Sequence, residues 1–99
     1  MFSAKILIVL TSHALLGTTG QKTGWHAEEF TTPYYHFVDS GHQVTIASIK
    51  GGEAPVDPGS IKDKTEDNPE SVQRYLKDNA LQDAIKNSVK IADINPAEY

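Results

Sequence analysis

Two adjacent carboxylates near the start of an amphipathic segment are the residues of this sequence best suited to chemistry. Glu28 and Glu29 lie within residues 25–40. The apolar residues of this segment are spaced as on one face of a helix, and they are Ala27, Phe30, Tyr34, Phe37 and Val38. Acidic residues in the first turn of a helix are commonly stabilised by the helix dipole. A carboxyl group held against the apolar face would instead have its pKa raised by desolvation, and it could exchange a proton with a reacting group. The local pattern alone leaves both interpretations of the pair open.

Histidines near this pair allow a metal site but do not form a recognisable one. His26 precedes Glu29 by three residues, and His13 lies in the loop before it. Scattered ligands of this kind are more often surface residues than a metal centre. The sequence contains no cysteine, which excludes disulfides, thiolate metal sites and a cysteine nucleophile from these 99 residues. We therefore expect no metal and no cofactor on this chain.

Residues 11–24 are rich in glycine and threonine and invite comparison with phosphate-binding loops. A P-loop needs glycine directly before its Lys-Thr or Lys-Ser pair, whereas Gln21 precedes Lys22 here. The spacing of Gly17, Gly20 and Gly24 does not match the dinucleotide-binding pattern either. We expect a flexible surface loop. The formal net charge of -4 also argues against a nucleic-acid partner, since such proteins usually carry a basic stripe.

The elements that must position these residues follow an α/β pattern. Residues 5–10 consist of Lys5 and a continuous run of five apolar residues, which is typical of a parallel strand buried on both faces. We expect a helix over residues 25–40, bent at Pro33 and ended by Gly41, and then a strand over residues 43–49. Strand, helix and strand together predict one βαβ unit.

The second half of the sequence, residues 51–99, predicts shorter elements. It also carries the whole net charge of -4, since acidic and basic residues balance in residues 1–50. After a turn-rich connection over residues 50–60, we expect one helix over residues 69–77 with Asn68 as its N-cap, and another over residues 79–87. Residues 89–94 fit a short edge strand or an extended segment. Two long strands and one short strand are few for a sheet with two buried faces, so the pattern predicts part of a larger sheet.

The apolar run near the N-terminus is too short for a targeting or membrane segment. It has five residues before a polar interruption, whereas a secretory core needs about 7–15 and a membrane helix about 20. We expect residues 1–99 to form one small domain or part of one, in the cytoplasm and with no membrane partner.

Several motifs in sequence order resemble the N-terminal half of ThiJ/PfpI superfamily proteins. They are the strand at 5–10, Lys-Thr-Gly-Trp-His-Ala-Glu-Glu at 22–29, Pro-Tyr-Tyr-His-Phe at 33–37 and Gly-Gly-Glu-Ala-Pro-Val-Asp-Pro-Gly-Ser at 51–60. The branch that the chain resembles in particular contains the stress-induced, glutathione-independent glyoxalases (glyoxalase III) and chaperone-like proteins. The resemblance covers nearly the whole chain. It implies a flavodoxin-like parallel sheet sandwiched by helices, as in class I glutamine amidotransferase domains, of which this chain is an incomplete part.

The resemblance also implies a site. In the family a cysteine at a strand-to-helix turn works with a histidine and with a protonated glutamate that hydrogen-bonds the sulfur. That glutamate lies four residues before a proline, so it matches Glu29 and not Glu28. Trp25 and His26 match positions near the rim of the pocket. The implied substrate is a small 2-oxoaldehyde, and the implied lyase reaction converts methylglyoxal to lactate through a cysteine hemithioacetal without metal or nicotinamide.

The family's cysteine and histidine lie beyond the segment that resembles this chain. We therefore expect residues 1–99 to be inactive alone, and to form a homodimer as in the family or to associate with a C-terminal chain that carries the nucleophile. Two alternatives remain. One is a cysteine amidase or peptidase of the same superfamily, and the other is a chaperone-like interaction module that acts through exposed apolar surface.

Overall fold

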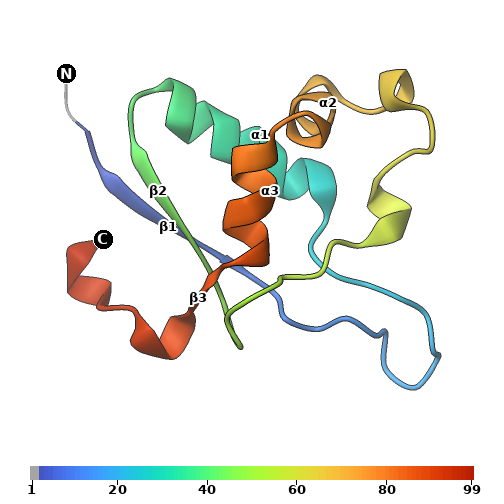
Figure 1. The fold of residues 1–99 in the computed structure, drawn as a ribbon, viewed down its shortest axis with the longest axis horizontal. Coiled ribbons are helices and arrows are strands. Elements are labelled where there is room, and N and C mark those ends of the chain that lie inside the picture. The colour runs from blue at the N-terminus through green and yellow to red at the C-terminus, as the bar shows by residue number, and fades with distance from the viewer. Residues whose placement is uncertain (1–2) are drawn as a thin grey trace.

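A three-stranded parallel sheet carries the helices of this protein (Figure 1). The computed structural model describes residues 3–99. The strands lie in the order β1 (Lys5–Leu10), β2 (Gln43–Ser48) and β3 (Val89–Lys90). The other elements are the helices α1 (Ala27–Asp39), α2 (Glu70–Leu76) and α3 (Asn79–Lys86), and short 3-10 turns at Pro58–Ser60, Thr65–Asp67, Ile91–Asp93 and Pro96–Glu98. This arrangement confirms the expected α/β class and an incomplete flavodoxin-like sheet.

β1 is an edge strand of this sheet. It pairs with β2 along its whole length, from Lys5 opposite Gln43 to Leu10 opposite Ser48, and within residues 3–99 it has no second neighbour. The expected burial on both faces is therefore not met: only Leu10 of β1 is fully buried, and Val9 is 47% exposed. An apolar strand whose outer edge is open presents unpaired backbone groups that can accept another strand.

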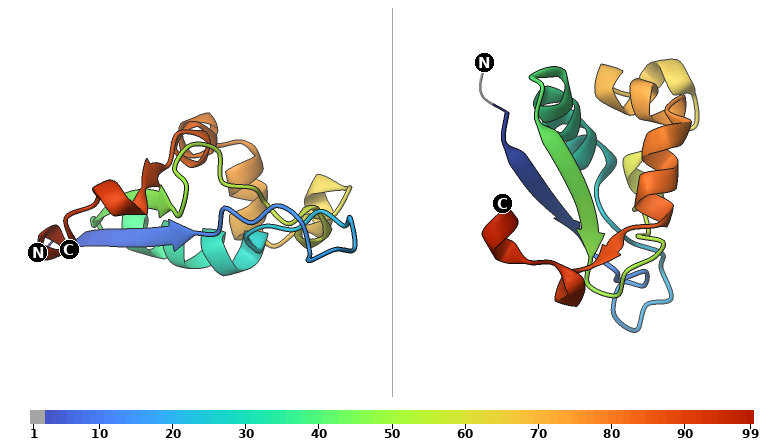
Figure 2. Two further views of the ribbon diagram at one scale, coloured as in Figure 1. Left: turned by 90° about the horizontal axis from the view of Figure 1, so that it is seen from below. Right: turned by 60° about the vertical axis from the view of Figure 1, so that its left-hand side comes forward.

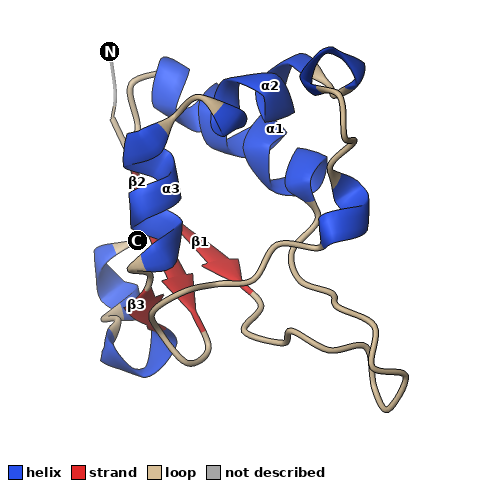
Figure 3. Cartoon of the chain, turned by 45° about the vertical axis from the view of Figure 1, so that its right-hand side comes forward, coloured by secondary structure: helices blue, strands red, loops and turns tan. Residues whose placement is uncertain are grey.

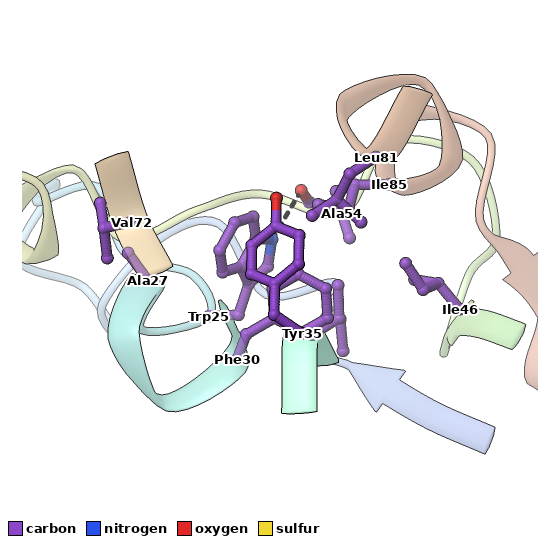
Figure 4. Packing of buried hydrophobic residues seen from close by; sticks show 10 residues of the cluster. Trp25, Ala27, Phe30, Tyr35, Ile46, Ala54, Val72, Leu81 and Ile85 are labelled. Carbon is purple, nitrogen blue, oxygen red and sulfur yellow. Dashed lines mark hydrogen bonds between the residues drawn. The ribbon is translucent and has the colours of Figure 1, made fainter. Parts of the chain in front are cut away.

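The apolar stripe of α1 packs into the main hydrophobic cluster (Figure 4). The helix runs unbroken through Pro33, and Ala27 and Phe30 are buried as expected. The rest of the buried face is rotated from the predicted one, because Tyr35 and Thr31 are buried while Tyr34 is only half-buried. Thr31 and Tyr35 are buried because each forms a hydrogen bond with a side chain from a distant segment.

Those partners are side chains of α2 and the turn after it. The Thr31 and Ser71 hydroxyls are hydrogen-bonded at 2.8 Å, and the Tyr35 hydroxyl donates to the Asp78 carboxylate at 2.9 Å. Burial and this bond to Asp78 raise the pKa of the Tyr35 hydroxyl far above its usual range. A buried polar group is tolerated when it is hydrogen-bonded, so these pairs allow the rotated face.

The expected N-cap of α2 is wrong. Helix α2 begins at Glu70 after Pro69, and Asn68 is buried one residue further out. Its side chain accepts from the Lys62 amide at 2.7 Å and donates to the Lys62, Lys64 and Thr65 carbonyls. An amide that both donates and accepts satisfies the backbone of this charged loop, and a helix cap would use only its oxygen.

The C-terminal residues fold back beside the sheet (Figure 2). β3 has only two residues, because the chain turns into a 3-10 helix at Ile91–Asp93 where an extended segment was possible. The Tyr99 hydroxyl then bonds Thr45 of β2 at 2.9 Å. Residues 11–24 form the expected exposed loop, which reaches away from the sheet and helices (Figure 3). Among the described residues, no helix combines the length and apolar character needed to cross a membrane.

We predict that the isolated 99-residue chain self-associates through the open edge of β1. Substituting Val9→Lys should shift the chain toward monomer, because a charge on an edge strand opposes strand addition. Sedimentation velocity at increasing protein concentration measures this directly. Gln21→Lys adds the same charge in the exposed loop and should leave association unchanged. A parent chain that stays monomeric with a sharp thermal transition would contradict the prediction.

Candidate functional site

An apolar hollow of about 240 Å³ lies along the outer edge of β1. Its lining includes three consecutive β1 residues and none of β2, which places it on the open side of the strand. The other wall comes from α1 and the residues just before it. The lining residues are Ile8, Val9, Leu10, Trp25, His26, Glu29, Phe30, Pro33 and Phe37. Glu29 and His26 are the ionisable members of this set, so any proton chemistry here falls to them.

The structure brings Glu29 and His26 together at the rim of this hollow. His26 is the N-cap of α1, and its Nδ1 accepts a hydrogen bond from the Glu29 amide at 3.4 Å. The same Nδ1 lies 3.9 Å from a Glu29 carboxylate oxygen, which is too long for a hydrogen bond. Since a nitrogen that accepts from an amide carries no proton to donate, we assign the cap and no ion pair. Both carboxylate oxygens of Glu29 are therefore open to another partner.

Glu29 is exposed in this chain. Its side chain is 82% accessible, whereas the family resemblance implies a buried acid. The open side of β1 explains the exposure, because no described segment covers the hollow there. The burial expected for a complete family site stays a prediction. Glu28 is also exposed but does not line the hollow, so the two neighbouring glutamates point in different directions from α1. The choice of Glu29 as the family's acid stays a prediction.

Trp25 is a packing residue that forms part of the hollow's lining. It is buried, and its Nε1 donates to the Ala54 carbonyl at 3.0 Å, which Figure 4 shows as a dashed line. Its ring packs edge-on against Phe30 and Tyr75, with centroids 5.1 and 5.6 Å away. An indole held on three sides has little freedom, so Trp25 gives the hollow a rigid wall.

The segment around residues 54–60 holds the start of α1. The Trp25 amide donates to the Pro55 carbonyl at 2.9 Å, and the Asp57 amide donates to the Trp25 carbonyl at 2.8 Å. The Ser60 hydroxyl accepts from the Ala27 amide at 2.9 Å and donates to the Asp57 carbonyl at 2.6 Å. An otherwise unpaired amide of the first helical turn is thus satisfied by a distant residue. These bonds fix where α1 begins and therefore where Glu29 points.

Sequence reasoning did not identify Asp57 and Ser60 as positioning residues. Their motif was visible, but a role that spans more than 30 residues leaves no local signal. The structure does not bring His13 to His26 and Glu29, since His13 lines a different hollow. Within residues 3–99 no three histidine or acidic side chains are grouped as metal ligands would be.

Two solved structures are similar to this chain over 97% of its length. Rapid Encystment Protein 24 kDa from Francisella tularensis shares 36% identity with a TM-score of 0.84, and glyoxalase III from Candida albicans shares 29% identity with a TM-score of 0.74. The chain covers 41% of the first and 40% of the second, so it spans about two fifths of the length of these relatives. No protein-family model and no curated protein sequence matches it.

We predict that Gly24→Ala displaces Trp25 and opens the hollow. A Cβ at Gly24 would lie 2.0 Å from the Pro55 carbonyl oxygen, so the 54–57 segment must move away. The expected cost is about 3 kcal/mol, at the upper end of ordinary overpacking. A red-shifted emission of the single tryptophan and a lower urea midpoint would report it.

Gly59→Ala is the matched control for this substitution. Its Cβ would meet the nearest atom, an Asp57 carboxylate oxygen, at an ordinary 3.5 Å, so we expect a change within about 0.5 kcal/mol. Equal effects of the two substitutions would show that the close approach at Gly24 does not hold Trp25.

Proposed function

Because the chain belongs to the ThiJ/PfpI superfamily, we propose that it supplies the acid-bearing part of a glyoxalase III-type active site, with Glu29 as the acid. Two observations support this proposal. The chain is similar to a glyoxalase III over nearly its whole length. Glu29 stands at the rim of an apolar hollow on the side of β1 where the sheet is open.

The position of Glu29 fits a nucleophile that arrives with a neighbouring strand. A further parallel strand paired with β1 would end beside the carboxyl end of β1, where Leu10, Trp25 and His26 lie. Active residues of open α/β sheets gather beyond the carboxyl ends of strands. A cysteine following such a strand would sit over the hollow and within reach of Glu29.

The proposed chemistry needs a carboxyl group and a thiolate close together. The thiolate adds to the aldehyde carbon of a 2-oxoaldehyde such as methylglyoxal, and the carbonyl oxygen takes up a proton to give the hemithioacetal. Glu29 in its protonated form would donate a hydrogen bond to the sulfur and support the thiolate. The apolar wall made by Ile8, Phe30 and Pro33 suits the small methyl group of such a substrate.

In this proposal residues 1–99 supply the acid and another chain segment supplies the cysteine, so the 99-residue chain is inactive alone. The sequence holds no cysteine, so no hemithioacetal can form on its own residues. The partner is a chain segment equivalent to the remaining length of the relatives, and its site of attachment is the open edge of β1.

A chaperone-like role is a second candidate, and exposed apolar side chains favour it. Val9, Leu15, Leu16 and Ile49 are each about half exposed. Such side chains can hold unfolded segments without any catalytic group. Suppression of client aggregation that is unchanged by Glu29→Gln but lost in Leu15→Ser and Ile49→Ser would support this role.

We predict that Glu29 is required for turnover once the site is complete. The test is a chimera in which residues 1–99 replace the equivalent segment of the Candida albicans glyoxalase III. In this chimera Glu29→Gln should lower methylglyoxal turnover by roughly 10²–10⁴, the usual effect of removing a positioned acid or base. Lactate formation is the measurement, and the thermal transition confirms that each variant is folded.

Glu28→Gln is the control. This substitution removes the same charge one residue away, and Glu28 does not line the hollow. It should retain turnover within a few-fold. A folded chimera that stays fully active with Glu29→Gln, or loses activity with Glu28→Gln, would contradict the assignment of Glu29.

A further inference from the structure

A second and larger hollow lies where the chain leaves β1 and β2. It measures about 440 Å³ and shares no lining residue with the hollow beside Glu29. Its lining residues are Thr11, Ser12, His13, Ala14, Leu15, Ile49 and Lys50. Ligands of open α/β sheets bind beyond the carboxyl ends of the strands, and the volume falls within the roughly 300–1,000 Å³ of small-molecule sites. The proposed function makes no use of this hollow.

Hydrogen bonds that involve backbone amides hold the walls of the hollow. The Lys50 amide donates to the Ser12 hydroxyl oxygen at 2.9 Å and joins the exits of the two strands. On the loop side, Leu15 pairs with Lys22 in an antiparallel bridge. The residues that line the hollow are thus positioned before any ligand arrives, which lowers the cost of ordering them on binding.

The turn after Lys50 is fixed as well. Gly51 and Gly52 both have positive φ, and Gly52 exchanges two backbone hydrogen bonds with Ser88. A side chain at Gly51 would press against Lys90, its Cβ lying 3.1 Å from the Cβ of Lys90. Lys90 therefore adjoins the turn that carries Lys50 and adds a second cation near this end of the sheet.

The charge of the hollow is opposite to that of the protein. Lys50 gives its lining a positive charge and no acidic residue lines it, whereas the chain carries a net charge of -4. A concave site lined by one sign of charge raises the local concentration of the opposite ion. The hollow therefore favours an anion.

Two hydroxyl groups can add directional hydrogen bonds to this anion. Thr11 Oγ1 accepts from the His13 amide at 3.0 Å, and Ser12 Oγ accepts from the Lys50 amide. Within residues 3–99 neither O–H proton is given to a protein acceptor. Each hydroxyl can therefore donate to an oxygen of a ligand.

The remaining wall is apolar. Leu15 is 50% and Ile49 58% exposed, and both side chains belong to the lining beside the basic and hydroxyl groups. An inorganic anion has no apolar part, so Leu15 and Ile49 would stay exposed to water when it binds. We propose that the hollow binds a small monocarboxylate, with its carboxylate at Lys50, Thr11 and Ser12 and its aliphatic part against Leu15 and Ile49.

Butyrate is a suitable probe for this site. Titration of the 99-residue chain, followed by amide chemical shifts, should show saturable binding with changes centred on residues 11–15 and 49–50. Lys50→Gln should weaken binding about fivefold, as expected for losing one partly screened charge contact. Lys22→Gln removes the same charge from the loop over residues 11–24, outside the hollow, and should change binding less than twofold.

Titrations with inorganic phosphate and with acetate separate the contribution of the anionic group to binding from that of the aliphatic tail. Both should bind more weakly than butyrate, and Leu15→Ser should reduce the affinity for butyrate to that for acetate. Absence of saturable binding, or equal weakening by Lys22→Gln and Lys50→Gln, would overturn the proposed site. Phosphate binding as tight as butyrate binding, with no effect of Leu15→Ser, would overturn the monocarboxylate assignment.

Discussion

The unpaired outer edge of β1 is the constraint on which this structure depends. Six consecutive residues of β1 pair with β2 on one side, and on the other side the described chain offers no partner. Backbone amides and carbonyls on such an edge either meet water or accept another strand. The same openness leaves Val9 half exposed, forms the hollow beside β1, and places Glu29 at its rim instead of in an interior.

The segment that contains Ala54, Asp57 and Ser60 is held by hydrogen bonds within the chain, and it fixes one wall of the hollow beside the open edge of β1. Through Trp25 and the first turn of α1, it sets the direction of the helix before any partner is present. Gly24 allows the required backbone approach, because even a methyl group there would overlap Pro55. The motif at residues 51–60 can thus be explained physically: its residues position the acid-bearing helix, and none of them needs to contact substrate.

The long elements could be predicted from the sequence because their signals are local. A continuous apolar run gave β1 with its observed bounds, and the spacing of Ala27 and Phe30 gave α1. The buried face beyond Phe30 could not be predicted, because Thr31 and Tyr35 are buried through hydrogen bonds to residues about 40 positions away. Asn68 was misassigned for a different, local reason, since its amide donates to three carbonyls of its own loop instead of capping α2. The choice of Glu29 over Glu28 came from the family resemblance and stays a prediction, because lining a hollow does not make a carboxylate a catalytic acid.

Amide hydrogen exchange of residues 5–10 tests the central role of the β1 edge most directly. It is measured in the isolated chain, at a concentration where sedimentation shows a monomer, and in the chimera with the Candida albicans glyoxalase III. If the rest of the active site attaches along this edge, the β1 amides that face away from β2 should exchange freely in the isolated chain and at least about 100-fold more slowly in the chimera. Equal exchange rates for these amides in a folded chimera would contradict the account.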